Sequence, residues 1–153
     1  MALGNNALPQ EVAFHHLSEY PMSLVTAALN DRWNLINAGD SLTTPSGEST
    51  FTVTEVSADE ISINAGHGSP IKLRRAAFVA GLQYLVDHAH VAVRKCEIRS
   101  NMIYKDAGLL CKTVRDANSA SGGTMVITYV LPILQRMRLV DIDSKKPNRV
   151  WLT

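Results

Sequence analysis

The chain has 153 residues, 46% of them hydrophobic and 19% charged, which is the composition of a globular protein and excludes a disordered or coiled-coil chain. No apolar run approaches the roughly 20 residues that a membrane-spanning helix needs. The start of the chain lacks the basic and apolar regions of a secretory signal. The two cysteines, Cys96 and Cys111, have no CxxC spacing, which favours reduced thiols over a disulfide framework. We therefore expect a cytoplasmic protein with no membrane contact.

The formal net charge of +1 is unevenly distributed along the chain. Residues 94–153 hold eleven basic and five acidic residues, a net charge of +6, whereas residues 1–93 hold four basic and nine acidic residues, a net charge of −5. Such asymmetry indicates a polyanionic or acidic partner for the basic half. Alternatively, the two halves attract each other, within the chain or between subunits. We predict two domains, an acidic α+β domain at 1–93 and a basic domain at 94–153.

The first third of the chain predicts helices. Residues 1–7 read as a loose tail, and residues 8–20 have helical apolar spacing with a proline suited to the first turn. A second helix is predicted from Leu24 to about Asn34, capped by Ser23. Its inward-facing residues are predicted to be Leu24, Val25, Ala28, Leu29 and Trp33.

The middle of the chain changes to the alternation of β-strands. Strands are predicted at 41–44, 50–57 and 60–64 as an antiparallel meander, extended by 71–73 after a Gly-rich loop at 65–70. Helical spacing returns from Arg74 to His88, with an apolar stripe at Ala77, Phe78, Gly81, Leu82, Leu85 and Val86. Arg74 and Arg75 lie at the start of this helix, the unfavourable end of its dipole for a cation. We expect these arginines either to contact a partner molecule, to be exposed to solvent, or to pair with Glu55 or Glu60.

The C-terminal part predicts a short strand, helices and a hairpin. The strand falls within 91–97, and Gly108 divides the segment from about 100 to 118 into two short helices. Thr124 is suited to cap a helix that runs to Leu139, with apolar residues at Val126, Ile127, Val130, Leu131, Leu134 and Met137. Two alternating strands follow, Val140 to Asp143 and Arg149 to Thr153, around a polar tip at 144–148.

This order of elements, a helix leading directly into a hairpin with lysines at its tip, resembles the last third of a winged helix-turn-helix domain. The resemblance covers roughly the last sixty residues and is one of element order, not of a diagnostic motif. It implies a helix that enters the DNA major groove and a hairpin, the wing, that touches the DNA backbone. The predicted fold is therefore α+β: N-terminal helices with a small antiparallel meander and a packing helix, followed by a C-terminal winged-helix-like domain.

Candidate contacts with double-stranded DNA are polar or basic residues on this helix, on the wing and near the preceding strand. They are Thr124, Thr128, Tyr129, Arg136, Arg138, Lys145, Lys146, Arg149, Arg94, Lys95 and Arg99. Lys105, Lys112 and Arg115 could extend this surface. Pro132 removes a helical hydrogen bond and should kink the helix. Tyr129 and Ile133, taken as exposed, would equally suit a dimer or domain interface. The wing is therefore the better candidate than the helix, although surface lysines also serve solubility and block edge pairing.

Other chemistries lack a complete motif. His15–His16 and His88–His90 have neither zinc-site spacing nor completing ligands, so neither a metal site nor a cofactor is expected. The Gly-rich loop at 65–70 has no phosphate-loop pattern. Asp141 and Asp143 share a strand face that should point to solvent. Basic neighbours could lower the pKa of the two thiols, but nothing else indicates a nucleophile.

Three functions are compatible with these patterns. The first is a non-enzymatic DNA-binding protein, acting as a regulator of transcription or as a DNA-reading accessory of a larger complex. The second is a protein-interaction or homodimerisation module that does not bind nucleic acid. The third is a small enzyme or ligand-binding protein whose pocket lies between the two halves.

Overall fold

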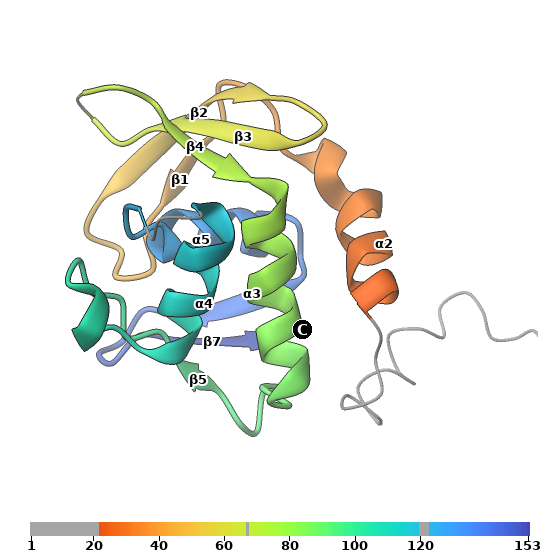
Figure 1. Cartoon of the computed structure of the whole chain (residues 1–153), viewed down its shortest axis with the longest axis vertical. Helices are drawn as coiled ribbons and strands as arrows, with labels where there is room; N and C mark the ends of the chain where they lie inside the picture. The colour runs from red at the N-terminus through yellow and green to blue at the C-terminus, as the bar shows by residue number, and fades with distance from the viewer. Residues whose placement is uncertain (1–21, 67, 120–122) are drawn as a thin grey trace, which may run out of the picture.

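The computed structural model describes residues 22–66, 68–119 and 123–153. They form the predicted α+β fold, in which helices α3, α4 and α5 lie between a four-stranded antiparallel sheet and a small three-stranded sheet (Figure 1). The predicted tail at 1–7 and helix at 8–20 lie outside the described residues. None of the helices in the described ranges is long and apolar enough to cross a membrane.

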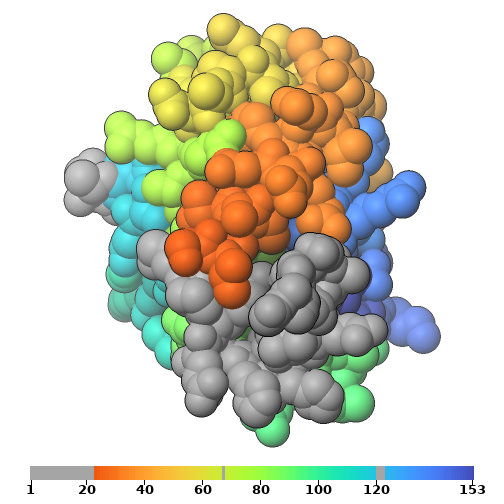
Figure 2. Space-filling view, turned by 90° about the vertical axis from the view of Figure 1, so that its right-hand side faces the viewer, coloured from red at the N-terminus to blue at the C-terminus, as the bar shows by residue number. Residues whose placement is uncertain are grey.

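Helix α2 spans Met22–Arg32 and tightens into a 3-10 turn at Trp33–Leu35. It lies on the surface next to the four-stranded sheet (Figure 2). Its predicted inward residues Val25, Leu29 and Trp33 are buried. Two details of the prediction are wrong: Ser23 lies within the helix rather than capping it, and Leu24 is 39% exposed.

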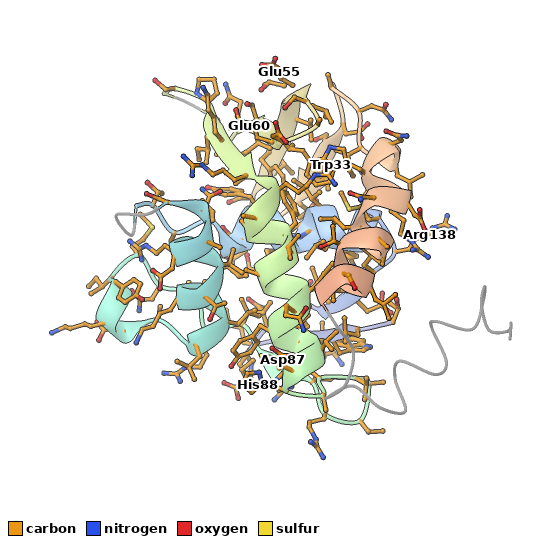
Figure 3. The ribbon with its side chains drawn as sticks, turned by 45° about the vertical axis from the view of Figure 1, so that its right-hand side comes forward. Trp33, Glu55, Glu60, Asp87, His88 and Arg138 are labelled. Carbon is orange, nitrogen blue, oxygen red and sulfur yellow. The ribbon has the colours of Figure 1, made fainter. Side chains whose placement is uncertain are left out.

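Trp33 joins three segments of the N-terminal half (Figure 3). Its Nε1 donates a hydrogen bond to the Ser57 carbonyl at 2.8 Å, and its ring meets that of Phe78 edge to face at 5.3 Å. The Arg75 guanidinium lies over the indole at 4.1 Å, and its Nε donates to the Ala58 carbonyl. The predicted pairing of Arg75 with Glu55 or Glu60 is therefore wrong, because the guanidinium is held by the indole and a turn carbonyl.

The predicted meander and its fourth strand are confirmed. The strands are β1 (Ser41–Thr43), β2 (Thr50–Val56), β3 (Glu60–Asn64) and β4 (Ile71–Arg74), and each pairs antiparallel with the next. One face of this sheet is largely exposed, apart from the buried Ser62 of β3. The other face contributes to the core the side chains of Leu42, Phe51, Val53, Ile61, Ile63 and Leu73. Gly47 supplies the positive φ, +80°, that the β1–β2 turn requires.

Helix α3, Arg75–Asp87, lies at the centre of the molecule (Figure 1). The predicted apolar stripe is confirmed, since all six of its residues are buried. Helix α4, Leu109–Asn118, packs closely against it: a Cβ on Gly81 would lie 3.3 Å from Cγ2 of Val114. The lack of a side chain at Gly81 thus allows the two helices to approach.

Side-chain bonds and a shared core connect the two halves of the chain. Asn118, the last residue of α4, accepts a hydrogen bond from the Arg74 backbone at 2.7 Å and donates one to the Lys72 carbonyl at 3.1 Å. The buried apolar residues form one cluster, to which α3, α4 and α5 all contribute. The core therefore continues across the predicted domain boundary at residues 93 and 94.

The C-terminal elements are β5 (Cys96–Glu97), a 3-10 turn (Tyr104–Asp106), α4, α5 (Ile127–Arg136), β6 (Val140–Asp143) and β7 (Arg149–Leu152). The sheet order is β5-β7-β6, with both pairings antiparallel. The hairpin is therefore joined on one edge by the short strand that precedes α4. Its inner face contributes Cys96, Val140, Val150 and Leu152 to the core.

Helix α5 is shorter than predicted. Its N-cap position is Val126, without a side-chain cap, while Thr124 lies exposed at a bend, so the predicted Thr124 cap is wrong. The helix ends at Arg136 rather than Leu139, and Arg138 follows with a φ of +65°. Burial of Val126 and Ile127, both under 2% exposed, accounts for the start of the helix better than side-chain capping does.

Candidate nucleic-acid interface

Helix α5 presents little free surface. Its six buried residues are Ile127, Val130, Leu131, Pro132, Ile133 and Leu134, so the prediction that Ile133 is exposed is wrong. The ring of Tyr129, partly buried, meets Phe51 of the four-stranded sheet edge to face at 5.2 Å. A helix that reads a major groove must present several side chains to the bases. Here the N-terminal sheet covers much of the face that would do so.

The C-terminal end of α5 is also tied to the N-terminal sheet. Arg136 lies 3.6 Å from the Asp40 carboxylate and donates a hydrogen bond to the Ser41 carbonyl at 3.2 Å. Arg138, in contrast, projects from the edge of the molecule (Figure 3). Of these two predicted DNA contacts, Arg136 has an intramolecular role and Arg138 is exposed.

The tip of the β6–β7 hairpin, residues 144–148, carries two exposed cations, Lys145 and Lys146. The Asp143 carboxylate accepts a hydrogen bond from the Lys145 backbone at 3.0 Å, and Asn148 Nδ2 donates to the Ser144 carbonyl at 2.8 Å. These bonds hold the backbone of the tip. The shape of the tip therefore does not depend on either lysine side chain, and both ammonium groups face solvent.

Arg149 has acidic neighbours on both adjacent strands. In the strand register it stands opposite Glu97 of β5 on one side and opposite Asp143 of β6 on the other. Residues directly opposite in an antiparallel pair have Cβ atoms about 5 Å apart, so the two carboxylates lower the positive potential at Arg149. Arg149 is therefore a weaker phosphate contact than its place on the wing suggests.

The remaining predicted cations lie elsewhere on the surface. Arg94 and Lys95 precede β5, at the end of the small sheet away from the tip, and the Lys95 ammonium lies over the Trp151 ring at 4.3 Å. Arg99 is exposed with a φ of +48°, and its stem packs on Gly108. The basic residues after position 93 thus divide among several regions and do not form one face.

Two further cations proposed as extensions of that surface lie on α4. Arg115 is only 9% exposed, and it donates hydrogen bonds to the carbonyls of Gly123 at 2.8 Å and Met102 at 3.1 Å. The Lys112 ammonium lies 5.4 Å from the Tyr104 ring. Arg115 therefore holds the segments on either side of α4 together instead of extending a basic surface, which corrects that expectation.

A cleft of about 290 Å³ opens between the N-terminal sheet and the C-terminal elements. Its walls come from the β1–β2 turn, the end of β3, the segment after β5, the first turn of α5 and the base of the wing. They are lined by Thr44, Pro45, Ser46, Ser49, Thr50, Ala65, Ile98, Ser100, Thr128, Tyr129 and Asn148. The cleft brings together two predicted contacts, Thr128 and Tyr129, with the wing residue Asn148.

None of these lining residues is charged, and some of their polar groups have no partner among the described residues. The hydroxyls of Ser100 and Tyr129 make no hydrogen bond with any residue that the structure describes, and Thr128 contacts only the Met125 sulfur, at 3.7 Å. The sequence did not identify the β1–β2 turn or Ser100 as parts of a binding site. The run of hydroxyl residues in TTPSGEST was the available signal, but it was interpreted only as a hairpin connection.

The thiols and histidines have structural partners. Burial, followed by the nearby Glu97 charge, raises the pKa of Cys96 to about 11, and burial also raises the pKa of Cys111. The predicted net lowering of these pKa values is therefore wrong, because burial outweighs the lowering effect of Arg115 on the pKa of Cys111. His88 and His90 direct Nδ1 at the carbonyls of Tyr84 and Arg94, at 2.9 and 2.8 Å.

The predicted absence of a histidine metal site concerns two pairs. His15 and His16 lie outside the described residues. Within the described ranges, no group of three or more His, Cys, Asp or Glu side chains is placed to hold a metal ion. The rings of His88 and His90 instead stack on Tyr84, with centroids 4.2 and 6.1 Å from its ring.

Compared with protein-family models, with curated proteins and with solved structures, the chain matches none of them. Function is therefore inferred from geometry and chemistry alone.

Proposed function

We propose that this chain is a non-enzymatic double-stranded DNA-binding protein whose C-terminal part is a winged helix that holds the phosphate backbone through its wing. The element order supports this: three helices, α3, α4 and α5, lead into the β6–β7 hairpin, and β5 joins the hairpin as a third strand. The charge of residues 94–153 has the sign that a DNA partner requires. A regulator and an accessory subunit of a larger complex are both compatible with this proposal.

The observation that carries the proposal is the pair of exposed lysines at the wing tip. Lys145 and Lys146 are adjacent, and the backbone around them is held by hydrogen bonds that do not use their side chains. Cations placed in this way can release counterions from a phosphate backbone, which is the main source of affinity in sequence-independent binding. Because α5 is largely covered, we expect backbone contacts to dominate and discrimination between sequences to be small.

The test is the salt dependence of duplex binding, measured by fluorescence anisotropy with a labelled duplex. The Lys145→Ala, Lys146→Ala double variant should bind more weakly, and the slope of log K against log salt should fall in magnitude by about 2, close to one per lost phosphate contact. The matched control is Lys72→Ala with Arg74→Ala, which removes the same charge from exposed positions on the N-terminal sheet, outside the wing. This control should leave the slope nearly unchanged.

Two outcomes would refute the proposal. One is the absence of duplex binding by the full chain at about 50 mM salt, where electrostatic binding is strong. The other is a wing variant and a control variant that lose affinity equally, which would show that only net charge matters.

A second function, a protein-interaction module, is favoured by an exposed apolar patch beside α4. Met102, Ile103 and Leu109 are 65%, 57% and 64% exposed, and they lie close together in sequence around the 3-10 turn at Tyr104–Asp106. Exposed apolar patches of this kind mark protein contacts. Light scattering after size exclusion would separate the two functions, because a dimer that does not bind DNA and dissociates on Ile103→Ser favours the interaction module.

A further inference from the structure

We infer that the cleft between the N-terminal sheet and the wing is a binding site for the nucleoside part of a nucleotide, with its phosphate directed toward the wing-tip lysines. This inference rests on the proposed function in using the same wing. It adds a second site, with its own ligand chemistry, to the backbone contact. It also gives a role to a cavity that is lined by residues from both halves of the chain.

The chemistry of the lining matches a neutral ligand that both donates and accepts hydrogen bonds. The described walls supply hydroxyl and amide groups and no formal charge. A hydroxyl can donate or accept, and the Asn148 side chain can do both at once. The edges of nucleobases and the hydroxyls of a sugar present alternating donors and acceptors of this kind, so such a wall can satisfy them. A lining of charged groups would instead be expected for a carboxylate, an ammonium ion or a metal ion.

Some of the polar groups that line the cleft are not used by the described residues, although the hydroxyls of Thr44 and Ser46 bond within the β1–β2 turn. The hydroxyls of Tyr129 and Ser100 have no hydrogen-bond partner among the described residues. Asn148 donates two hydrogen bonds through Nδ2, to the carbonyls of Ser144 and Lys145, which leaves Oδ1 as an acceptor. Ligand binding therefore does not require that any of these groups first break a bond within the protein.

The position of Tyr129 is fixed by packing and not by its hydroxyl. Its ring meets Phe51 edge to face at 5.2 Å, with an interplanar angle of 78°. The hydroxyl is thus held at the cleft by contacts made elsewhere on the ring. A Tyr129→Phe change keeps the ring and removes only the hydroxyl, which makes it a conservative probe of the site.

The size of the cleft selects a single nucleotide over a larger ligand. At about 290 Å³ it lies just below the usual range of ligand pockets, roughly 300 to 1,000 Å³. A DNA duplex cannot enter such a cleft. A nucleotide can occupy it either as a free molecule or after turning out of the helical stack, which costs a few kcal/mol in a paired duplex and less at a mispair.

The positive charge of the wing-tip lysines, at the margin of the cleft, suits the phosphate group of a nucleotide. Asn148 lines the cleft and follows Lys145, Lys146 and Pro147 along the wing tip, so two exposed cations adjoin an uncharged wall. A ligand that is neutral at one end and anionic at the other satisfies both surfaces. A nucleotide has that distribution of charge, whereas a neutral sugar or an inorganic anion satisfies only one of them.

The experiment has two arms, one for each source of nucleotide. In the first, isothermal titration calorimetry measures the binding of each deoxynucleoside 5′-monophosphate to the full chain, with inorganic phosphate as the reference. In the second, anisotropy compares a fully paired duplex with the same duplex carrying one mispaired 2-aminopurine, whose fluorescence rises when it leaves the stack. We expect at least one arm to respond, the second with a preference for the mispaired duplex of about tenfold, because a mispaired base costs less to unstack.

Variants locate the response in the cleft. Removal of three hydroxyls, by Tyr129→Phe, Thr128→Val and Ser100→Ala, should reduce the preference for the mispaired duplex, or the affinity for the monophosphate, by at least about tenfold, each lost hydrogen bond contributing around 1 kcal/mol. Affinity for the paired duplex should stay within about twofold of that of the unchanged chain. Tyr104→Phe is the control, since it removes a hydroxyl that bonds Asp116 outside the cleft. Ser100→Trp, at an exposed position, tests the same site by filling it.

The outcomes separate this inference from the proposed function. Equal binding of paired and mispaired duplexes, together with no monophosphate binding above that of inorganic phosphate, would overturn the cleft inference and leave the wing proposal intact. Monophosphate binding that needs the three hydroxyls, in a chain that binds no duplex, would support the cleft with a free nucleotide as its ligand and refute the wing proposal. A response unchanged by both the triple variant and Ser100→Trp would place the nucleotide elsewhere and overturn the inference.

Discussion

Helix α5 and the wing are adjacent in the chain, and the sequence makes both of them candidates for DNA contact, but the structure gives them opposite environments. Six of the ten residues of α5 are buried, and its polar residues include Arg136, which is bound to β1 and to the turn before it. The wing tip has two exposed lysines, whose side chains form no hydrogen bond or ion pair with any residue that the structure describes. The amphipathic pattern that marks a recognition helix is thus used here to build a core.

The difference arises from the number of layers around each element. A helix in a three-helix domain needs one apolar stripe, and the opposite face remains free. In this chain the four-stranded sheet adds a second covering layer, so that α5 is packed against α3 and α4 and also against β1. The tip of the wing lies beyond this covering layer, and its two lysines are exposed. Which of the two elements is exposed therefore depends on packing by the four-stranded sheet, which is distant in sequence, and not on the local sequence.

The largest expected effect follows from separation of the two halves. A fragment of residues 94–153 would lack α3, against which α4 and α5 pack, and would expose buried residues such as Leu110 and Val114. Loss of the main apolar contact exceeds the net stability of a small domain, on the order of 5–15 kcal/mol. We therefore expect the fragment to show no cooperative thermal transition by circular dichroism, in contrast to the full chain. A cooperative transition in the fragment alone would instead support two independent domains divided at residue 93.

A smaller effect distinguishes α5 from the wing directly. Ile133, fully buried on α5, should lose about 2–5 kcal/mol of the free energy of unfolding when changed to Ala, through the lost apolar contacts and the cavity left behind. Lys145→Ala at the exposed tip should change the same quantity by no more than about 0.5 kcal/mol. Urea denaturation of both variants measures the contrast. Similar losses from the two changes would show that α5 is not the covered element.

The parts of the fold that the sequence predicted are those determined by local periodicity. The strand alternation at Phe51, Val53, Ile61 and Ile63 and the stripe along α3 are both present as predicted, because each depends on one element facing one core. Helix ends were less accurate. Thr124 has the side chain of a cap, but the helix begins at Ile127, where buried apolar residues begin.

The candidate site was predicted less completely, for a different physical reason. The wing lysines could be identified because solvent exposure of a charged hairpin tip is a local property. The cleft could not, since its walls come from residues as far apart as Thr44 and Asn148, and no local pattern indicates that they meet. Arg115 was mispredicted for the same reason. Its charge suggested a surface role, but its guanidinium donates hydrogen bonds to the carbonyls of Met102 and Gly123, on either side of α4.

The last and smallest prediction concerns the base of the wing, whose inner face is as deeply buried as α5. Cys96 of β5 stands opposite Val150 of β7, and burial raises its pKa to about 11 from an ordinary value near 9. At a pH between these two values, the thiol of the unfolded chain loses its proton while that of the folded chain keeps it. The free energy of unfolding is therefore unaffected by this group below about pH 9 and falls as pH rises toward 11, by at most about 2–3 kcal/mol.

Cys96→Ala isolates this contribution. Burial also raises the pKa of Cys111 and Tyr84, so the variant should keep part of the decline between pH 8 and pH 11, but a smaller part than the unchanged chain. Chemical denaturation at several pH values measures the free energy of unfolding of both proteins. Their difference at each pH contains a pH-independent loss of stability from removal of the sulfur, so only the change of this difference with pH reports the thiol. Parallel curves would mean that solvent reaches the Cys96 thiol, and hence that the small sheet opens at its base as well as at its tip. A divergence that grows with pH would instead support a wing whose exposed tip is carried on a closed, buried base.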